Sequence, residues 1–384
     1  MQQGSIRAST GTPATMSASD LEPLPASLGV TSVVLKRYVD AGPVPDDAFG
    51  VDNTTLDAAA LPEGGVLAEL LYLSVDPYMR PLMRENKAHY APSFTLGQPL
   101  AGGAVALVRV SKAEGFSPGD VIVGHAPWST FVALGPGELG AFNAVPKGLL
   151  GKVPLSYFLG TLGMPGLTAY SSLKKIAEPK AGETAYISAA SGAVGQVAGQ
   201  LLKRVYGCRV VGSAGSDDKV ALLRNLGFDA AWNHREVAPG EGLAAHCPDG
   251  VDIYFENVGG ETLDAVLEHA NLHCRIVACG MISQYDLTPE QRYGVKNLFQ
   301  IVAKQIKLQG FIVSTLAKGI EGEFAADMAR WVAEGKIKVV EHVTPGIEAA
   351  PAAFRAMMAG GNLGKAVVRV AERDPFPAAT AAKA

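Results

Sequence analysis

The sequence has few charged residues for its size. Charged side chains make up 18% of the 384 residues and the net charge is −4, against roughly 25% charged residues in an average soluble protein. No excess of lysine and arginine is available to neutralise phosphates, so we expect no nucleic-acid partner. No uncharged apolar run approaches the ~18 residues that span a bilayer, so we expect no membrane partner either. The hydrophobic content of 48% excludes a disordered chain.

Closely spaced cysteines are also absent. The chain has four cysteines, Cys208, Cys247, Cys274 and Cys279, and none of them forms a C-x-x-C pair. A structural zinc site usually requires such pairs. His125 follows a predicted strand, but no cysteine or acidic residue stands where a second metal ligand is expected. We therefore interpret His125 as a solvated or packed side chain. The sequence therefore predicts no metal site.

The two ends of the chain differ from the rest in composition. Residues 1–27 are rich in Ser, Thr, Ala, Gln and Pro, with Arg7 as the only base. This composition predicts a disordered N-terminal extension. A transit peptide is the alternative, although such peptides are usually rich in arginine. The Ala- and Pro-rich residues 373–384 are expected to be a disordered tail.

The remaining chain contains two different sequence patterns, which predict two domains. Residues 28–155 contain short apolar runs broken by Gly and Pro, a pattern typical of a compact β-barrel. Residues 156–336 alternate strands with helices, which is typical of a doubly wound parallel sheet in an α/β protein. Residues 337–372 leave this pattern and are expected to return to the first domain. The expected buried strands of the second domain are residues 183–190, 209–213, 251–255, 275–279 and 306–313, and its expected helices include 192–206, 217–226 and 323–334.

The clearest chemical signal is a glycine turn at residues 189–195, with the sequence Ala-Ala-Ser-Gly-Ala-Val-Gly. It follows a predicted strand and opens a predicted helix, the setting in which backbone N–H groups bind a pyrophosphate. Gly192 lets the backbone approach the phosphates, and Gly195 permits close packing of helix and strand. Ala189 stands where the usual fingerprint has its first glycine. The alternative interpretation is a turn that only packs the helix against the strand and binds no cofactor.

The residues after the second strand indicate which nucleotide binds. An NAD site places a carboxylate at the end of this strand, where it accepts from the ribose 2′-hydroxyl. Here the strand ends Val-Val-Gly-Ser-Ala-Gly at residues 210–215, without an acid. Lys219 lies one turn into the next helix, where an ammonium group can meet a 2′-phosphate. Asp217 and Asp218 are nearer in sequence, but acids at this position also stabilise a helix N-terminus. The pattern favours NADP(H), with a solvated Lys219 as the alternative.

Several sequence blocks in the same order resemble a known family. They include DPYMR at 76–80, GMPGLTAY at 163–170, the 189–195 turn, FENVGG at 255–260, CGMISQY at 279–285 and GNLGK at 361–365. The chain resembles the zinc-independent medium-chain dehydrogenase/reductases, in particular the alkenal/one oxidoreductase group that contains prostaglandin reductases and plant NADP-dependent alkenal double-bond reductases. The resemblance implies a GroES-like catalytic domain, split in sequence around a Rossmann domain, with NADP(H) in the cleft between them. It also implies a homodimer.

The resemblance further implies a set of cofactor-binding residues. Gly192, Ala193, Val194 and Gly195 are expected to hold the pyrophosphate, and Lys219 the 2′-phosphate. Where the family often has a tyrosine near this phosphate, the present sequence has His234. The residues expected around the nicotinamide and its riboses are Asn257, Cys279, Gly280, Met281, Ile282, Ser283, Gln284, Tyr285, Phe311, Ile312, Val313 and Asn362.

The same resemblance predicts reduction of the α,β double bond of a small-molecule enal or enone, without a metal. Charge then develops on the carbonyl oxygen, and Tyr285 is the expected proton donor to it, because phenols titrate near pH 10 and keep their proton at neutral pH. Tyr78 is expected to line the substrate cleft. Quinone reduction is the nearest enzymatic alternative, and a catalytically silent NADPH-binding protein is the non-enzymatic one. The expected location is the cytoplasm, with an organelle as the alternative.

Overall fold

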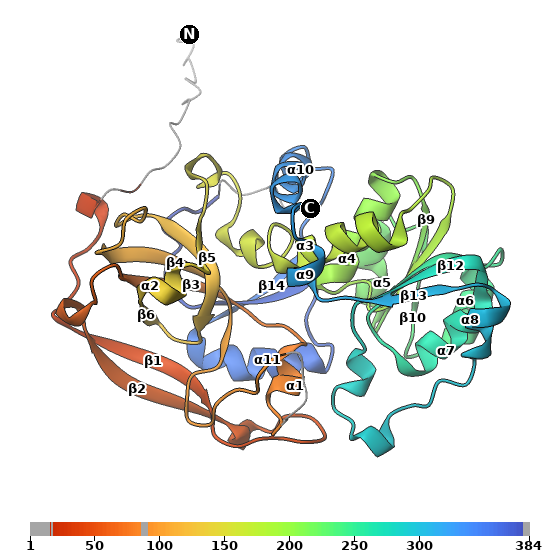
Figure 1. Cartoon of the computed structure of the whole chain (residues 1–384), viewed down its shortest axis with the longest axis horizontal. Helices are drawn as coiled ribbons and strands as arrows, with labels where there is room; N and C mark the ends of the chain where they lie inside the picture. Colours follow the sequence, from red (N-terminus) through yellow and green to blue (C-terminus); the bar gives the residue numbers. More distant parts are fainter. Residues whose placement is uncertain (1–15, 17, 86–90, 379–384) are drawn as a thin grey trace, which may run out of the picture.

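The structure is a computed structural model that describes residues 16, 18–85 and 91–378. Figure 1 shows two halves side by side, one formed by the N-terminal third together with the last strands and helix, the other by the middle of the chain. The expected N-terminal extension lies mostly outside the described residues. Within the described ranges, no helix is both long and apolar enough to cross a membrane.

The middle of the chain forms a six-stranded parallel sheet, as the strand–helix alternation predicts. Its order is β10-β9-β8-β11-β12-β13, the arrangement of a doubly wound dinucleotide-binding fold. Successive residues of one strand enter different cores: Ile253 and Phe255 pack on one face of the sheet, and Tyr254 on the other. Both faces are therefore covered, which explains the nearly continuous apolar runs of these strands. The strands are β8 (Thr184–Ile187), β9 (Arg209–Ala214), β10 (Ala230–Asn233), β11 (Val251–Glu256), β12 (Ala270–Ala278) and β13 (Lys307–Gly310).

Helices connect these strands and form the two covering layers (Figure 1). The two helices nearest the glycine turn begin where the sequence predicts, and α5 opens at Ser216, whose side chain accepts from the Lys219 amide. The helices are α3 (Met164–Ser172), α4 (Ala193–Arg204), α5 (Asp217–Leu226), α6 (Pro239–His246), α7 (Gly260–His269), α8 (Phe299–Ala303), α9 (Val313–Leu316) and α10 (Glu321–Ala333).

The prediction for the last strand of this sheet is wrong in part. Residues 306–313 are expected to form a buried strand, but β13 spans only Lys307–Gly310 and most of it is exposed. It pairs with β12 on one side and is the edge of the sheet. An apolar run cannot reveal whether a strand has one neighbour or two.

The first part of the chain forms a second domain around a mixed sheet ordered β14-β15-β3-β4-β5-β7, with β6 also paired to β3 and a separate hairpin β1-β2. We call it the catalytic domain, after the expectation stated above. Strand β15 pairs antiparallel with β3, so the C-terminal segment lies in the sheet of the N-terminal one. The strands are β1 (Ser27–Leu35), β2 (Phe49–Asp57), β3 (Val66–Ser74), β4 (Ala101–Ser111), β5 (Val121–Pro127), β6 (Phe131–Leu134), β7 (Asn143–Ala144), β14 (Glu341–Pro345) and β15 (Lys365–Arg369). The helices are α1 (Met79–Leu82), α2 (Pro136–Leu139) and α11 (Ala350–Met358).

The expected disorder of the C-terminal tail is wrong for residues 373–378. Phe376 is 2% exposed and belongs to a core cluster with Leu71 and Val367. The Tyr72 hydroxyl donates to the Asp374 carboxylate at 2.9 Å. One aromatic residue is enough to anchor a short tail that has a disorder-prone composition. Residues 379–384 lie outside the described part of the chain.

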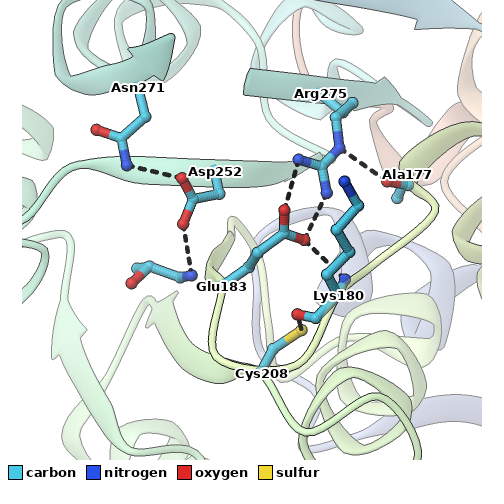
Figure 2. Close-up of polar contacts among 8 residues, drawn as sticks. Ala177, Lys180, Glu183, Cys208, Asp252, Asn271 and Arg275 are labelled. Atoms are coloured by element: carbon cyan, nitrogen blue, oxygen red, sulfur yellow. Dashed lines mark hydrogen bonds and ion pairs between the residues drawn. The ribbon is translucent and has the colours of Figure 1, made fainter. Parts of the chain in front are cut away.

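A polar network ties the strands together near their amino ends (Figure 2). Arg275 of β12 donates to both carboxylate oxygens of Glu183, at 2.9 and 2.5 Å, and to the Ala177 carbonyl at 2.9 Å. Asp252 of β11 accepts from the Asn271 side chain at 2.8 Å. Bidentate pairs like that of Arg275 with Glu183 are among the stronger hydrogen bonds in proteins. This edge of the sheet is therefore internally satisfied.

We predict that Glu183→Gln lowers the free energy of unfolding by about 1.5–3 kcal/mol at pH 7, the range for hydrogen bonds to charged groups. Partial burial alone raises the pKa of Glu183, but its hydrogen bonds from Arg275 and the Lys180 amide outweigh burial, and the pKa lies below its ordinary value of 4.5. A depressed carboxyl pKa stabilises the fold above the ordinary value, and this contribution is lost as pH falls through the folded-state pKa. Urea unfolding from pH 3 to 7 measures the difference.

The difference between wild type and Glu183→Gln is expected to shrink below pH 4.5. A difference that stays constant down to pH 3 would contradict the electrostatic explanation. Asp47→Asn is the matched control, because Asp47 pairs with Arg37 on the surface and such pairs contribute less than about 1 kcal/mol.

Candidate functional site

The residues expected to bind a nucleotide follow the carboxyl ends of the parallel strands. The 192–195 turn follows β8, His234 follows β10, and Asn257 follows β11. Residues 279–285 follow β12, and residues 311–313 follow β13. Because parallel strands end at one edge, the topology places these segments along the same side of the sheet. Ligands of open α/β sheets bind in the crevice outside this edge.

The glycine turn has the backbone that phosphate binding requires. Ala189 adopts a left-handed conformation with φ of 46°, so it supplies the turn for which the usual fingerprint uses glycine, at a cost of roughly 1–2 kcal/mol. A side chain at Gly195 would begin 2.7 Å from the Ala189 carbonyl and 2.8 Å from Ala190, which leaves no room for it. Gly192 is the N-cap of α4 and provides no side-chain acceptor. The first amide groups of α4 are thus available to an anion.

Three basic side chains gather around two glycines beside this turn. A side chain at Gly215 would begin 3.2 Å from Nε2 of His234 and 3.4 Å from Nε of Arg235. A side chain at Gly360 would begin 3.4 Å from Arg235 and 3.7 Å from Nζ of Lys219. Burial, together with the charge of Arg235, lowers the pKa of Lys219, and the same two causes lower the pKa of His234. We call Lys219, His234 and Arg235 the basic cluster.

Two members of the basic cluster donate to neutral carbonyl groups of the other domain. Lys219 Nζ donates to the Gly360 carbonyl at 2.7 Å, and Arg235 donates to the Ala359 carbonyl at 3.1 Å. Neither cation forms an ion pair with a carboxylate among the residues that the structure describes. A phosphate dianion placed here would relieve the mutual repulsion of the cations. The cluster therefore fits a 2′-phosphate.

Sequence reasoning missed Arg235. It directly follows His234, so a basic residue next to the predicted contact was the available signal. Asp217, the acid that complicates the prediction of Lys219, accepts from the Asn233 side chain at 3.2 Å at the start of α5. Asp217 thus links the start of α5 to the end of β10.

The turn after β11 is organised by a buried carboxylate. Glu256 accepts from the backbone amides of Val258 and Gly259 at 2.6 and 2.8 Å, and from the Tyr254 hydroxyl at 2.7 Å. Burial raises the pKa of Glu256. Asn257 donates from its side chain to the Ser188 carbonyl at 2.8 Å, which joins the ends of β8 and β11. Neighbouring turns at this edge are thus held to one another.

The loop at residues 279–285 brings Tyr285 over the end of β12. The Met281 amide donates to the Tyr285 hydroxyl at 3.3 Å, and a side chain at Gly280 would begin 3.1 Å from that hydroxyl. Ser283 donates to the Val258 carbonyl at 2.5 Å, and the loop includes a short 3-10 turn at Ile282–Gln284. Burial, together with the carboxylate of Glu256, raises the pKa of the Cys279 thiol to about 12.

The remaining predicted residues come from both domains. Phe311 packs on the core of the nucleotide-binding domain, and Ile312 is exposed just before α9. Asn362 belongs to the catalytic domain and donates to the Gly364 carbonyl at 2.6 Å, two residues from the contact of Gly360 with Lys219. Tyr78 is half-buried at the start of α1 and packs on the catalytic-domain core.

The described residues contain no group of three or more His, Cys, Asp or Glu side chains that could hold a metal ion. His269 and His273 are four residues apart, but one ends α7 and the other lies in β12. The residue types at the crevice, a helix N-terminus and a basic cluster, suit a phosphorylated nucleotide.

Comparison with known proteins gives matches over both domains. Residues 193–334 match the family model described as zinc-binding dehydrogenase, and residues 32–140 match the N-terminal domain of oxidoreductase. The chain is 44% identical to the NADP(+)-dependent 2-alkenal reductase of Nicotiana tabacum, with 88% of this chain and 96% of that protein covered. It is 41% identical to prostaglandin reductase 1 of Rattus norvegicus, with 87% and 97% covered.

A solved structure shares both the fold and the sequence. CurA from Vibrio vulnificus in complex with NADPH is 39% identical to this chain, with a TM-score of 0.80. The alignment covers 89% of this chain and all of that one.

We predict that Lys219→Ala and Arg235→Ala each weaken the binding of adenosine 2′,5′-bisphosphate by about 10- to 100-fold, the effect of losing one charge-assisted hydrogen bond. Binding of adenosine 5′-monophosphate, which lacks the 2′-phosphate, should change less than about 3-fold. Isothermal titration calorimetry measures both ligands.

Lys203→Ala is the matched control, since Lys203 of α4 pairs with Asp229 and not with the basic cluster. Equal losses for the two ligands in Lys219→Ala would show that the cluster does not read the 2′-phosphate.

Proposed function

Because the chain belongs to the medium-chain dehydrogenase/reductase family that includes 2-alkenal reductase and prostaglandin reductase 1, we propose that it reduces the α,β double bond of enals and enones with NADPH. Relatives at about 40% identity cover most of the chain. One of them is the (+)-pulegone reductase of Mentha piperita. The observation on this chain that supports NADPH as the cofactor is the basic cluster. It lies beside the second strand of the domain, which ends without an acidic residue.

The proposed cofactor site uses the carboxyl edge of the parallel sheet. The first amides of α4 face the pyrophosphate, and the basic cluster receives the 2′-phosphate. Residues 257, 279–285 and 311–313 from this edge, with Asn362 from the catalytic domain, surround the nicotinamide half. When bound, NADPH supplies the hydride that adds to the β-carbon of the substrate.

Tyr285 is the proposed catalytic residue. Addition of hydride to the β-carbon moves negative charge to the carbonyl oxygen, and a hydrogen-bond donor at that oxygen lowers the barrier. The Tyr285 hydroxyl accepts from the Met281 amide, and its O–H is the group proposed to donate to the carbonyl oxygen of the substrate. Tyr78 is proposed to line the substrate cleft from the catalytic domain, next to α1.

The test of the function is oxidation of NADPH on mixing with trans-2-nonenal, a vinyl ketone or a quinone. Consumption with the enal and formation of the saturated aldehyde supports the proposal. Faster consumption with the quinone alone supports the quinone reductase alternative. Tight NADPH binding without oxidation by any of the three supports the silent binding protein.

We predict that Tyr285→Phe lowers kcat for enals by about 100- to 1,000-fold, since removal of one oxyanion donor typically has this effect. The KM for NADPH should change less than about 3-fold. Steady-state kinetics with trans-2-nonenal measure both parameters. Unchanged turnover would assign the role of donor to a cofactor ribose hydroxyl alone.

The homodimer is proposed to form through the edge strand β13. This strand is unpaired on its outer side within the described sheet, and an apolar surface lies beside it: Leu298, Phe299 and Val302 of the α8 region are 52%, 75% and 73% exposed. An exposed edge strand with apolar neighbours is a template for pairing with a second chain. Antiparallel pairing of two β13 strands would continue the sheet across a two-fold axis.

We predict that Phe299→Glu combined with Val302→Glu converts the dimer to a monomer at micromolar concentration, because two charges would then be buried in the interface. Light scattering coupled to gel filtration measures the mass. Val51→Glu is the matched control, since Val51 is 47% exposed on the catalytic domain. A wild-type chain of monomer mass, or a double variant of dimer mass, contradicts this interface.

A further inference from the structure

The residue that follows Tyr285 is bound by the other domain. Arg80 belongs to α1 of the catalytic domain, its side chain is completely buried, and its Nε lies 2.6 Å from Oδ1 of Asp286. Its other two nitrogens donate to the carbonyls of Val39 at 2.9 Å and Gly42 at 2.8 Å. Every guanidinium nitrogen therefore has an acceptor, which fixes the planar group in one orientation.

The backbone of the same segment is also held. The Gly42 amide donates to the Asp286 carbonyl at 2.7 Å. Arg84, just after α1, donates to the carbonyls of Tyr285 and of Leu287, the latter at 3.1 Å. Three consecutive residues, 285–287, are thus bound by the catalytic domain, although they belong in sequence to the nucleotide-binding domain.

The hydroxyl of Tyr285 is bound by its own domain. It lies on the Met281 amide, in the loop after β12. The carbonyl of Tyr285 is therefore bound by the catalytic domain, whereas its amide, which donates to the Ile282 carbonyl, and its hydroxyl are bound within its own loop. Tyr78 precedes α1 by one residue, so the segment that holds Asp286 also carries the second candidate tyrosine.

We propose that the ion pair of Arg80 with Asp286 positions the Tyr285 hydroxyl for donation to the substrate oxygen, an inference that rests on the proposed reductase function. Arg80 and Asp286 are positioning residues and do not themselves touch the reacting atoms. The pair completes the site only when the two domains are in contact. A shift of about 1 Å in a catalytic group can reduce turnover by 10²-fold, so a small movement of residues 285–287 is sufficient.

A double-mutant cycle tests this role. Asp286→Asn keeps the shape of the side chain and removes its charge. In the wild-type background we expect kcat for trans-2-nonenal to fall about 10- to 100-fold. In the Tyr285→Phe background, where no hydroxyl remains to be positioned, the same change should lower kcat less than about 3-fold. The KM for NADPH should change little in either background, because the basic cluster is untouched.

Two further variants make the result independent of folding defects. Arg80→Lys keeps the charge but cannot reach three acceptors, and it should show the same dependence on Tyr285. Asp286→Glu retains the charge and should recover part of the lost kcat. Glu183→Gln is the matched control for a lost ion pair remote from the crevice: it should lower the melting temperature without changing kcat. Circular dichroism confirms that each variant is folded at the assay temperature.

The outcomes separate the two hypotheses. Equal losses of kcat from Asp286→Asn in both backgrounds would mean that the pair only stabilises the domain contact, and would overturn the proposal. Full activity of Tyr285→Phe leaves nothing to position and overturns it too, while the reductase function stands. A wild-type enzyme that turns over no enal refutes the proposed function, and the positioning role with it.

Discussion

The common direction of six strands determines where this protein can carry out chemistry. Every strand from β8 to β13 runs the same way, so the loops after them meet at one edge. The other edge is closed by bonds within the domain, above all the bidentate pair of Glu183 with Arg275. The carboxyl ends of the strands are less completely bonded. Among the residues that the structure describes, the first amides of α4 have no side-chain cap, and the side chains of Lys219 and Arg235 donate to carbonyl groups and form no ion pair with a carboxylate. The bonds at the amino ends of the strands thus stabilise the fold, and the groups at their carboxyl ends are available to a ligand.

Electrostatics at the carboxyl edge couple nucleotide binding to the contact between the domains. Lys219 is half-buried and is repelled by the exposed Arg235, and both effects lower the pKa of Lys219. Their acceptors, the carbonyls of Gly360 and Ala359, follow the C-terminal end of α11, where the helix dipole is negative. A phosphate dianion is a stronger acceptor than a carbonyl. In the proposed cofactor site, a nucleotide with a 2′-phosphate would therefore compete with the catalytic domain for the same two cations.

The sequence predicts those parts of the site that are local in the chain. The spacing of Gly192 and Gly195, and the acid-free strand before Lys219, are visible within thirty residues because the turn and helix start are short-range features. The contact of Arg80 with Asp286 joins residues 206 positions apart, and no periodicity or motif encodes such a distance. The exposure of β13 was missed for a similar reason, since the number of neighbours of a strand is decided by the whole sheet. Phe376 shows that composition alone also misjudges a tail.

Several contacts between the domains are hydrogen bonds, beside the apolar packing of Ile337 and Val340 on the core of the nucleotide-binding domain. Gln196 and Gln200 of α4 each exchange two hydrogen bonds with the backbone, Gln196 with Val340 and Gln200 with Lys338. The basic cluster and the Arg80 pair add further polar contacts at other points of the same boundary. Water can replace such bonds one at a time, at a net cost of roughly 1 kcal/mol for each neutral bond, whereas an apolar interface would have to be exposed at once. Polar interfaces of this kind permit relative domain motion. Separation of the domains would break the bond from Arg84 to the Tyr285 carbonyl, while the Tyr285 amide would keep its bond to the Ile282 carbonyl.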